Sequence, residues 1–196
     1  MATRPQSVGF SVSARDVLAA LDRTGVRDLP GAVRRARNLR PFLESVVDPD
    51  VSALLAQQFA GRGARLRRGV RWARLRPSTV ARKGHDTPLV DTGALRSAWT
   101  NPRDARAKVT ITATSYARTV RGTHPGNGRR RRRAGSRPTM QQLSSWFETG
   151  TRGRTGMVAR PITGHGVPAP VTRAWAGKLG EYIATGRMPS RAVSGR

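Results

Sequence analysis

Two long stretches of this chain contain no acidic residue. From Val51 to His85, and again from Ala105 to Phe147, arginine and lysine are the only residues with a formal charge. Over the whole sequence 37 basic residues stand against 11 acidic ones, which gives a formal net charge of +26. A free monomer with this charge repels itself and binds polyanions. The two stretches therefore predict a basic surface band, and partners that are nucleic acid or acidic protein.

Length and composition limit the size of the core beneath this surface. A chain of 196 residues predicts one domain with extensions, and a hydrophobic fraction of 37% predicts a modest core. The absence of cysteine excludes disulfides and thiolate metal sites. No apolar stretch reaches the ~18 residues of a membrane span, and the N-terminus lacks the apolar core of a signal peptide. We expect a soluble protein that is not exported and has no membrane partner.

The first part of the chain has the residue spacing of helices. Ser13 to Gly25 predicts a short helix, and a second helical region follows Pro30 with a break at Pro41. Asp48 to Gly63 predicts a third helix, capped by Asp50. The apolar residues of these helices that we expect to face a core are Val17, Leu18, Leu21, Val33, Leu39, Phe42, Leu43, Val46 and Val47.

The middle of the chain changes from helical to strand spacing. Lys108 to Val120 alternates and is rich in β-branched residues, which predicts a strand. Asn101 to Arg106 has the composition of a turn, so Ser97 to Thr100 could be the partner strand of a hairpin. Arg71 to Leu75 is a further candidate for a short strand.

Helical spacing returns after a loop from Gly122 to Pro138. Thr139 to Gly150 predicts a helix capped by Thr139, and Pro170 to Gly186 predicts a closing helix. The expected apolar faces are Leu143, Trp146 and Phe147 on the first of these helices, and Val171, Trp175, Leu179, Tyr182 and Ile183 on the second.

These elements predict an α+β fold. We expect a small, mainly antiparallel sheet over Trp72 to Val120, packed with helices, together with a helical N-terminal extension and a long arginine-rich loop. The expected organisation is a helical N-terminal region (1–60), an α+β core (61–186) that contains the loop 122–138, and a flexible tail (187–196).

The string PLVDTG at residues 88 to 93 has the spelling of a retroviral-type aspartic protease loop. Such a protease needs two carboxylates that share one proton, so a chain with one such loop has to dimerise and pair two copies of Asp91. It also needs a mainly β domain around the loop. The helical first part of this chain, and the helical spacing of ALRSAW after the glycine, count against this interpretation.

A structural interpretation accounts for the same string. Asp91 or Thr92 can cap a helical turn that begins at ALRSAW, and Gly93 can adopt a positive φ. Leu95 and Trp99, four residues apart, then lie on one buried face.

Other catalytic or metal-binding arrangements are missing from the sequence. His85, His124 and His165 lie in contexts rich in Gly or Pro, and none has the spacing of a metal ligand. There is no close carboxylate cluster for divalent cations and no phosphate-binding loop of the GxxxxGK[ST] form. We therefore predict a protein that is not an enzyme and has no cofactor.

The segment Trp72 to Trp99 resembles the phage virion-morphogenesis family, the neck or tail-completion proteins of tailed bacteriophages. The family pattern has a Trp and a Pro-Ser-Thr segment, a Lys-Gly, and then Leu-x-Asp-Thr-Gly-x-Leu-x-x-Ser. The family serine falls at Ala98 if the spacing is strict, or at Ser97 one residue early. The matching residues are Trp72, Pro77, Ser78, Thr79, Lys83, Gly84, Leu89, Asp91, Thr92, Gly93 and Leu95.

Two later segments extend the resemblance. Ser115 to Thr123 resembles the family's Tyr-Ala segment, here Tyr116 and Ala117, followed by Gly-Thr. ARPITGHGVPAP resembles the Arg-Pro stretch before the closing helix. The resemblance spans about Phe59 to Ile183 and leaves out the arginine-rich loop and the first ~50 residues.

The resemblance implies a structural virion protein that forms a ring in the neck. This ring is the head–tail connector, tail-completion or tail-terminator layer that joins the DNA-filled head to the tail. The implied partners are further copies of the chain in a homohexamer, adjoining neck and tail proteins with acidic faces, and transiently the genomic DNA. The implied location is the head–tail junction of the virion, reached from the host cytoplasm during assembly.

A free arginine-rich nucleic-acid-binding protein is the alternative. Arginine-rich stretches bind phosphate through counterion release without reading bases. The low aromatic content of 5% provides few side chains for base stacking. The bias towards arginine follows equally from a GC-rich genome.

Arg129, Arg130, Arg131, Arg132 and Arg133 form one run within the loop 122–138. Their mutual repulsion predicts an extended loop, and a sixfold ring would carry a belt of about thirty such charges. This belt is expected to contact either DNA or an acidic rim of the adjoining ring. We favour the rim, because DNA has to slide past quickly. A loop with no dedicated partner is the remaining alternative.

Overall fold

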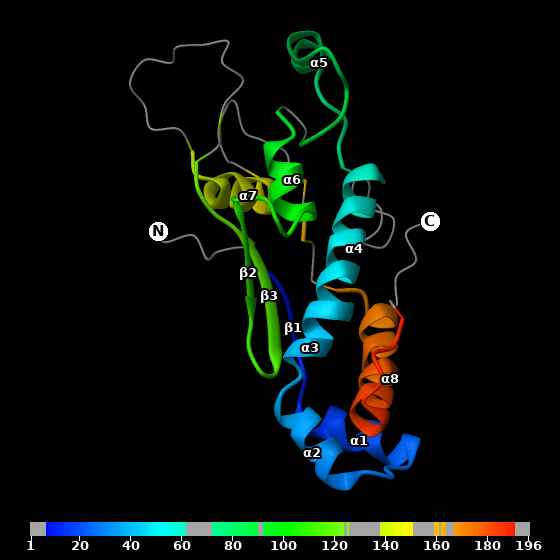
Figure 1. Ribbon diagram of the computed structural model, residues 1–196. Coiled ribbons are helices and arrows are strands. Elements are labelled where there is room, and N and C mark those ends of the chain that lie inside the picture. The colour runs from blue at the N-terminus through cyan, green and yellow to red at the C-terminus, as the bar shows by residue number, and fades with distance from the viewer. Residues whose placement is uncertain are drawn as a thin grey trace. The chain divides into compact units, whose positions relative to one another are not determined.

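The computed structural model describes residues 7–61, 72–89, 92–123, 125, 138–150, 159–160, 162–163 and 167–190. The fold is α+β, as the sequence predicted: a small three-stranded antiparallel sheet packs against helices (Figure 1). The helices are α1 (Ala14–Thr24), α2 (Leu29–Arg37), α3 (Arg40–Phe42), the π-helix η1 (Leu43–Val47), α4 (Asp48–Ala60), α5 (Pro77–Lys83), α6 (Ala94–Thr100), α7 (Met140–Thr149) and α8 (Ala169–Thr185). The strands are β1 (Val8–Ser11), β2 (Ala107–Ile111) and β3 (Ser115–Val120).

The sheet has the order β1-β3-β2, and its central strand β3 comes from the segment with alternating residues. The single strand predicted over Lys108 to Val120 is wrong, because this segment folds into two strands with a turn between them. The Thr112 hydroxyl accepts hydrogen bonds from the backbone N–H of Ser115 at 3.0 Å and of Thr114 at 3.4 Å. A hydroxyl that bonds the backbone two or three residues on favours a turn, and the alternating pattern continues through it.

The remaining strand predictions are also wrong. Ser97 to Thr100 lies in helix α6, and the described residues 72–75 form no strand. The third strand is β1, which pairs antiparallel with β3 so that Phe10 lies opposite Tyr116. Segments of four or five residues are too short for their spacing to separate strand from helix. This explains why β1 was missed within the expected helical region.

The described residues form two compact units. Unit 1 is built from Leu54–Lys108 and Thr119–His165, with Met1–Ser7, and unit 2 from Val8–Ala53, Val109–Arg118 and Gly166–Arg196. Each unit thus combines segments from distant parts of the chain.

Several helix ends agree with the sequence. α1 stops before Gly25, whose φ is 63°. Thr139 caps α7 through a capping box with Gln142: the Thr139 hydroxyl accepts from the Gln142 N–H at 3.1 Å, and the Gln142 side chain accepts from the Thr139 N–H at 2.9 Å. Four of the five residues predicted for the buried face of α8 are buried, namely Trp175, Leu179, Tyr182 and Ile183, whereas Val171 is half-buried.

Helix α4 does not begin at a free end, and the predicted cap at Asp50 is wrong for this reason. The helical backbone runs from α3 through η1 into α4, with the break at Asn38 and Leu39 instead of at Pro41, which lies in the first turn of α3. Asp50 is fully buried, and its carboxylate accepts the indole N–H of Trp175 at 2.8 Å.

The core of unit 2 packs α8 against the other elements of the unit. Phe42 stacks on Tyr182 at a ring distance of 5.9 Å, and Phe10 meets Trp175 edge-on at 4.9 Å. Helices α1 and α2 also pack on α8. Arg35 of α2 donates from Nε to the Ile183 carbonyl at 2.7 Å. A positive charge that bonds the last carbonyls of a helix stabilises its C-terminus.

Arg118 of β3 is a fully buried charge of unit 2. Its guanidinium donates to Asp48 Oδ1 at 2.5 Å and to the Ser52 hydroxyl at 2.8 Å. The Tyr116 hydroxyl donates to the same Asp48 oxygen at 2.7 Å. Burial raises the pKa of Tyr116 far above its usual range, so this hydroxyl stays protonated as a donor. The cluster ties β3 to α4 within unit 2.

Three residues that were expected on buried faces are exposed. Leu18 of α1 is 63% exposed, and Val33 of α2 and Trp146 of α7 are exposed as well. The buried side of α7 consists instead of Met140, Ser144 and Ser145. Helical spacing predicted an apolar stripe in each helix, but it did not determine which side of the helix meets the core.

We predict that Arg118→Met destabilises the protein by about 3 kcal/mol, because it leaves the Asp48 carboxylate without its buried partner. Arg118→Met combined with Asp48→Asn should recover part of this loss, since Asn removes the charge and keeps an acceptor for Tyr116. Urea denaturation followed by circular dichroism measures both variants. Equal losses in the single and double variants would contradict an ion pair as the source of the stability.

Candidate functional site

The segment that resembles the phage neck family supplies much of the core of unit 1. Trp72 is buried and meets Phe59 edge-on at a ring distance of 5.5 Å. Leu89 is buried with a φ of 60°, and Leu95 is buried on α6. Pro77 lies in the first turn of α5, followed by Ser78, which is exposed, and Thr79, which is half-buried.

The Asp-Thr-Gly string is a turn that starts helix α6. Gly93 is the residue before the helix, with a φ of 75°, and the Thr92 hydroxyl accepts from the Ala94 N–H at 3.3 Å. Leu95 and Trp99 are both buried, as the spacing predicted. Asp91 lies outside the described residues. The observed part of the string thus agrees with the structural interpretation.

Helix α6 is held to α7 and to the turn that follows it. The indole N–H of Trp99 donates to the buried Ser144 hydroxyl at 3.1 Å. At the candidate serine positions, Ala98 is fully buried and Ser97 is half-buried. Hydrogen bonds from the Arg106 side chain and from Ser97 hold the pKa of Asp104 far below its usual range. The Ser97 hydroxyl thus bonds Asp104 in the turn after α6, whereas Ala98 packs in the core.

Tyr116 and Ala117 of the Tyr-Ala segment belong to unit 2, whereas the described residues of Trp72 to Trp99 belong to unit 1. Tyr116 is buried in the Arg118 cluster, and Ala117 pairs with Gly9 across the sheet. Both are structural in this position.

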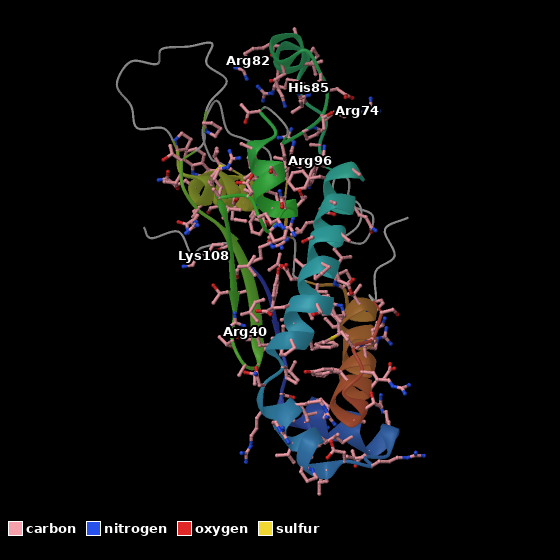
Figure 2. All side chains as sticks on the ribbon, in the orientation of Figure 1. Arg40, Arg74, Arg82, His85, Arg96 and Lys108 are labelled. Carbon is pink, nitrogen blue, oxygen red and sulfur yellow. The ribbon has the colours of Figure 1, made fainter. Side chains whose placement is uncertain are left out.

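Unit 1 has few carboxylates to balance its basic residues. Its described residues include ten that are basic and three that are acidic, whereas those of unit 2 include eleven basic and seven acidic. Figure 2 labels several of the basic side chains, with Arg74, Arg82 and His85 around α5 and Arg96 on α6. The exposed basic residues of unit 1 are Arg74, Arg76, Arg82, Arg96, Arg103, Lys108 and Arg121, and none of these forms a salt bridge within the described part of the chain.

Among the described residues of unit 1, two of the three carboxylates serve the fold. Asp104 bonds the Arg106 guanidinium through both oxygens, at 2.8 and 2.9 Å. Glu148 accepts from the backbone N–H of Ile162 at 2.8 Å and of Thr163 at 2.6 Å. The third, Asp86, is exposed. The surface of unit 1 consequently keeps most of its positive charge.

Residues 72–89 form a loop–helix–loop around α5, which we name the α5 segment. Arg160 donates from its guanidinium to the carbonyls of Ala73 at 3.0 Å and Arg74 at 3.2 Å. Burial lowers the pKa of Arg160 from its usual value. Lys83 donates to the Thr87 carbonyl at 3.0 Å. A hollow of about 610 Å³ lies beside α5, and its lining is Arg74, Leu75, Pro77, Val80, Ala81 and Asp86.

The histidines and carboxylates do not gather into a metal site within the described ranges. His85 accepts the Thr87 N–H at 3.3 Å through Nδ1, and His124 and His165 lie outside the described residues. Among the helices that the structure describes, none has the length and apolar character to cross a membrane.

The arginines of the α5 segment were missed as candidate contacts by sequence reasoning, which named only Arg129 to Arg133. That run lies outside the described residues. The sequence did contain a signal for these arginines. The stretch from Val51 to His85 has no acidic residue, and Arg74, Arg76 and Arg82 lie within it.

We predict that Gly93→Ala destabilises the protein by ~1–2 kcal/mol, because alanine is strained at a φ of 75° although no atom lies within 4 Å of its Cβ. Gly177→Ala is the matched control: its Cβ is equally unobstructed, but it lies inside α8. It should stabilise the protein by ~0.5–1 kcal/mol. Thermal denaturation compares the two, and a Gly93→Ala protein as stable as the parent would contradict the structural role of this turn.

The chain matches no protein-family model, no curated protein and no solved structure.

Proposed function

We propose that this chain is a structural protein of the neck of a tailed bacteriophage. It forms a homohexameric ring that joins the DNA-filled head to the tail. The observation that carries the proposal is that the Thr92–Gly93 turn starts a helix whose Leu95 and Trp99 are buried. The segment that resembles the family is therefore used to build the fold of a subunit.

The surface of unit 2 supports assembly with other proteins. Apolar side chains that gather into one exposed patch commonly mark a contact surface. Helix α1 carries Leu18, helix α2 carries Leu29 and Val33, and the segment after α8 carries Met188, all of them exposed. In a cyclic ring each subunit presents two different surfaces to its neighbours. These four residues are the candidates for one such surface.

A ring of these chains also needs partners that offset its positive charge. Six chains that each carry +26 repel one another unless acidic partners or nucleic acid offset the charge. Neighbouring neck and tail proteins with acidic faces meet this requirement. The genome that passes through the neck meets it as well, although only transiently.

A free nucleic-acid-binding protein is the second candidate function. The exposed arginines of unit 1 favour it, since phosphate binding needs only accessible positive charge. Salt-sensitive DNA binding by a protein that neither forms a ring nor enters virions would support this candidate over the neck protein.

We predict that the purified protein assembles into a ring with six times the 21.3 kDa mass of one chain, alone or with its head or tail partners. Mass photometry measures the assembly, and negative-stain images show its symmetry. Leu18→Asp combined with Leu29→Asp should shift the population towards smaller species, with Ser13→Asp as a control on an exposed polar residue. Monomers only, even with head and tail partners present, would count decisively against the ring.

We predict that replacing Arg129 to Arg133 by Ser and Gly leaves the isolated fold intact and reduces head–tail joining. The loop is expected to contact an acidic rim, and this contact weakens when the five charges are removed. Circular dichroism tests the fold, and joining of separated heads and tails tests the function. Joining at normal efficiency in both low and moderate salt would show that the loop has no role in the contact.

A further inference from the structure

We propose that the α5 segment binds the phosphate backbone of double-stranded DNA through Arg74, Arg76 and Arg82. The inference rests on the proposed function for the identity of the polyanion, because the genome passes through a phage neck. That this segment binds a polyanion is inferred from the exposed arginines of unit 1. The proposed site is separate in the sequence from the run Arg129 to Arg133.

The three arginines are exposed basic side chains within one short segment of unit 1. All three are exposed, and none forms a salt bridge within the described residues. Arg76 comes immediately before α5, and Arg82 lies in its last turn. A helix of seven residues is about 10 Å long. Phosphates of one strand follow one another every ~3.4 Å along the axis of duplex DNA, so α5 spans about three of them.

The backbone that carries these arginines is held in place. Arg160 bonds the carbonyls of Ala73 and Arg74, and the buried Trp72 packs on Phe59 at the start of the segment. Gly84, with a φ of 78°, ends α5 through the bond from its N–H to the Val80 carbonyl. A surface whose backbone is already fixed loses less conformational entropy on binding.

The distribution of apolar side chains favours nucleic acid over a protein partner on unit 1. Protein interfaces usually contain an apolar centre surrounded by a polar rim. In unit 1 the one large hydrophobic residue that is exposed among the described residues is Trp146, on α7. The other four, Leu18, Leu29, Val33 and Met188, belong to unit 2. The two units thus differ in the partner that their surfaces fit.

The hollow beside α5 favours duplex over single-stranded DNA. Its apolar lining is Leu75, Pro77, Val80 and Ala81, all of them aliphatic. Single-strand binding draws much of its affinity from bases that stack on aromatic side chains, and the described residues that line this hollow include none. Contacts from the three arginines therefore reach the phosphate backbone, which permits sliding because it involves no base reading.

The test compares two triple variants that each remove three exposed arginines. Arg74, Arg76 and Arg82→Gln alters the α5 segment, whereas Arg23, Arg34 and Arg37→Gln removes the same charge from α1 and α2. The probe is a fluorescent duplex of about 30 base pairs, whose binding is measured by anisotropy between ~50 and ~200 mM salt. Urea denaturation and circular dichroism establish that both variants fold like the parent.

We expect the α5 variant to reduce the slope of log K against log salt by about 2.7, since each phosphate contact contributes ~0.9. The control variant should change this slope by less than ~0.9, the contribution of one phosphate contact. Equal reductions in the two variants would overturn the proposal, because they would mean that only net charge matters. Unchanged DNA binding together with weakened binding of poly-L-glutamate would overturn it in favour of an acidic protein partner.

The same variants separate this inference from the neck function. An α5 variant that forms rings and enters virions but binds DNA like the parent would overturn the inference and leave the neck function standing. The reverse result, loss of DNA binding by the α5 variant with no ring from any form of the protein, would support the inference and contradict the neck function.

Discussion

Eleven carboxylates serve 37 basic side chains in this protein, and at least four of them bond donors of the fold itself. Asp48 pairs with the buried Arg118, and Asp50 accepts the indole N–H of Trp175. Asp104 bonds Arg106, and Glu148 bonds backbone amides. A carboxylate that satisfies a buried donor is not available to neutralise the surface. In unit 1, Asp104 and Glu148 are two of the three carboxylates among the described residues, so the exposed arginines there keep their positive charge.

Local patterns in the sequence were sufficient for several elements. The capping box of α7, the buried face of α8 and the turn at Gly93 each depend on residues a few positions apart. The capping and spacing rules apply directly to such neighbours. The same rules account for the described part of the Asp-Thr-Gly string, Thr92 and Gly93, as the turn that starts α6.

Features that depend on distant residues could not be predicted in this way. Arg118 occupies an inward position of β3, between the buried Tyr116 and Val120, where alternation alone predicts an apolar residue. It is stable there because Asp48, far away in the sequence, lies within hydrogen-bonding distance. Strand β1 has only four residues, and its pairing with β3 is what defines it. The charge of the α5 segment was visible in the sequence, but its exposure and its fixed backbone required the fold.

We propose that this chain is a structural subunit of a phage neck, and the decisive experiment is a cryo-EM reconstruction of the head–tail junction in purified virions. We expect a closed ring of this chain between head and tail, with the Thr92–Gly93 turn inside each subunit at the start of α6. A complete junction in which every density is assigned to other proteins, with this chain absent from the particles, would contradict it.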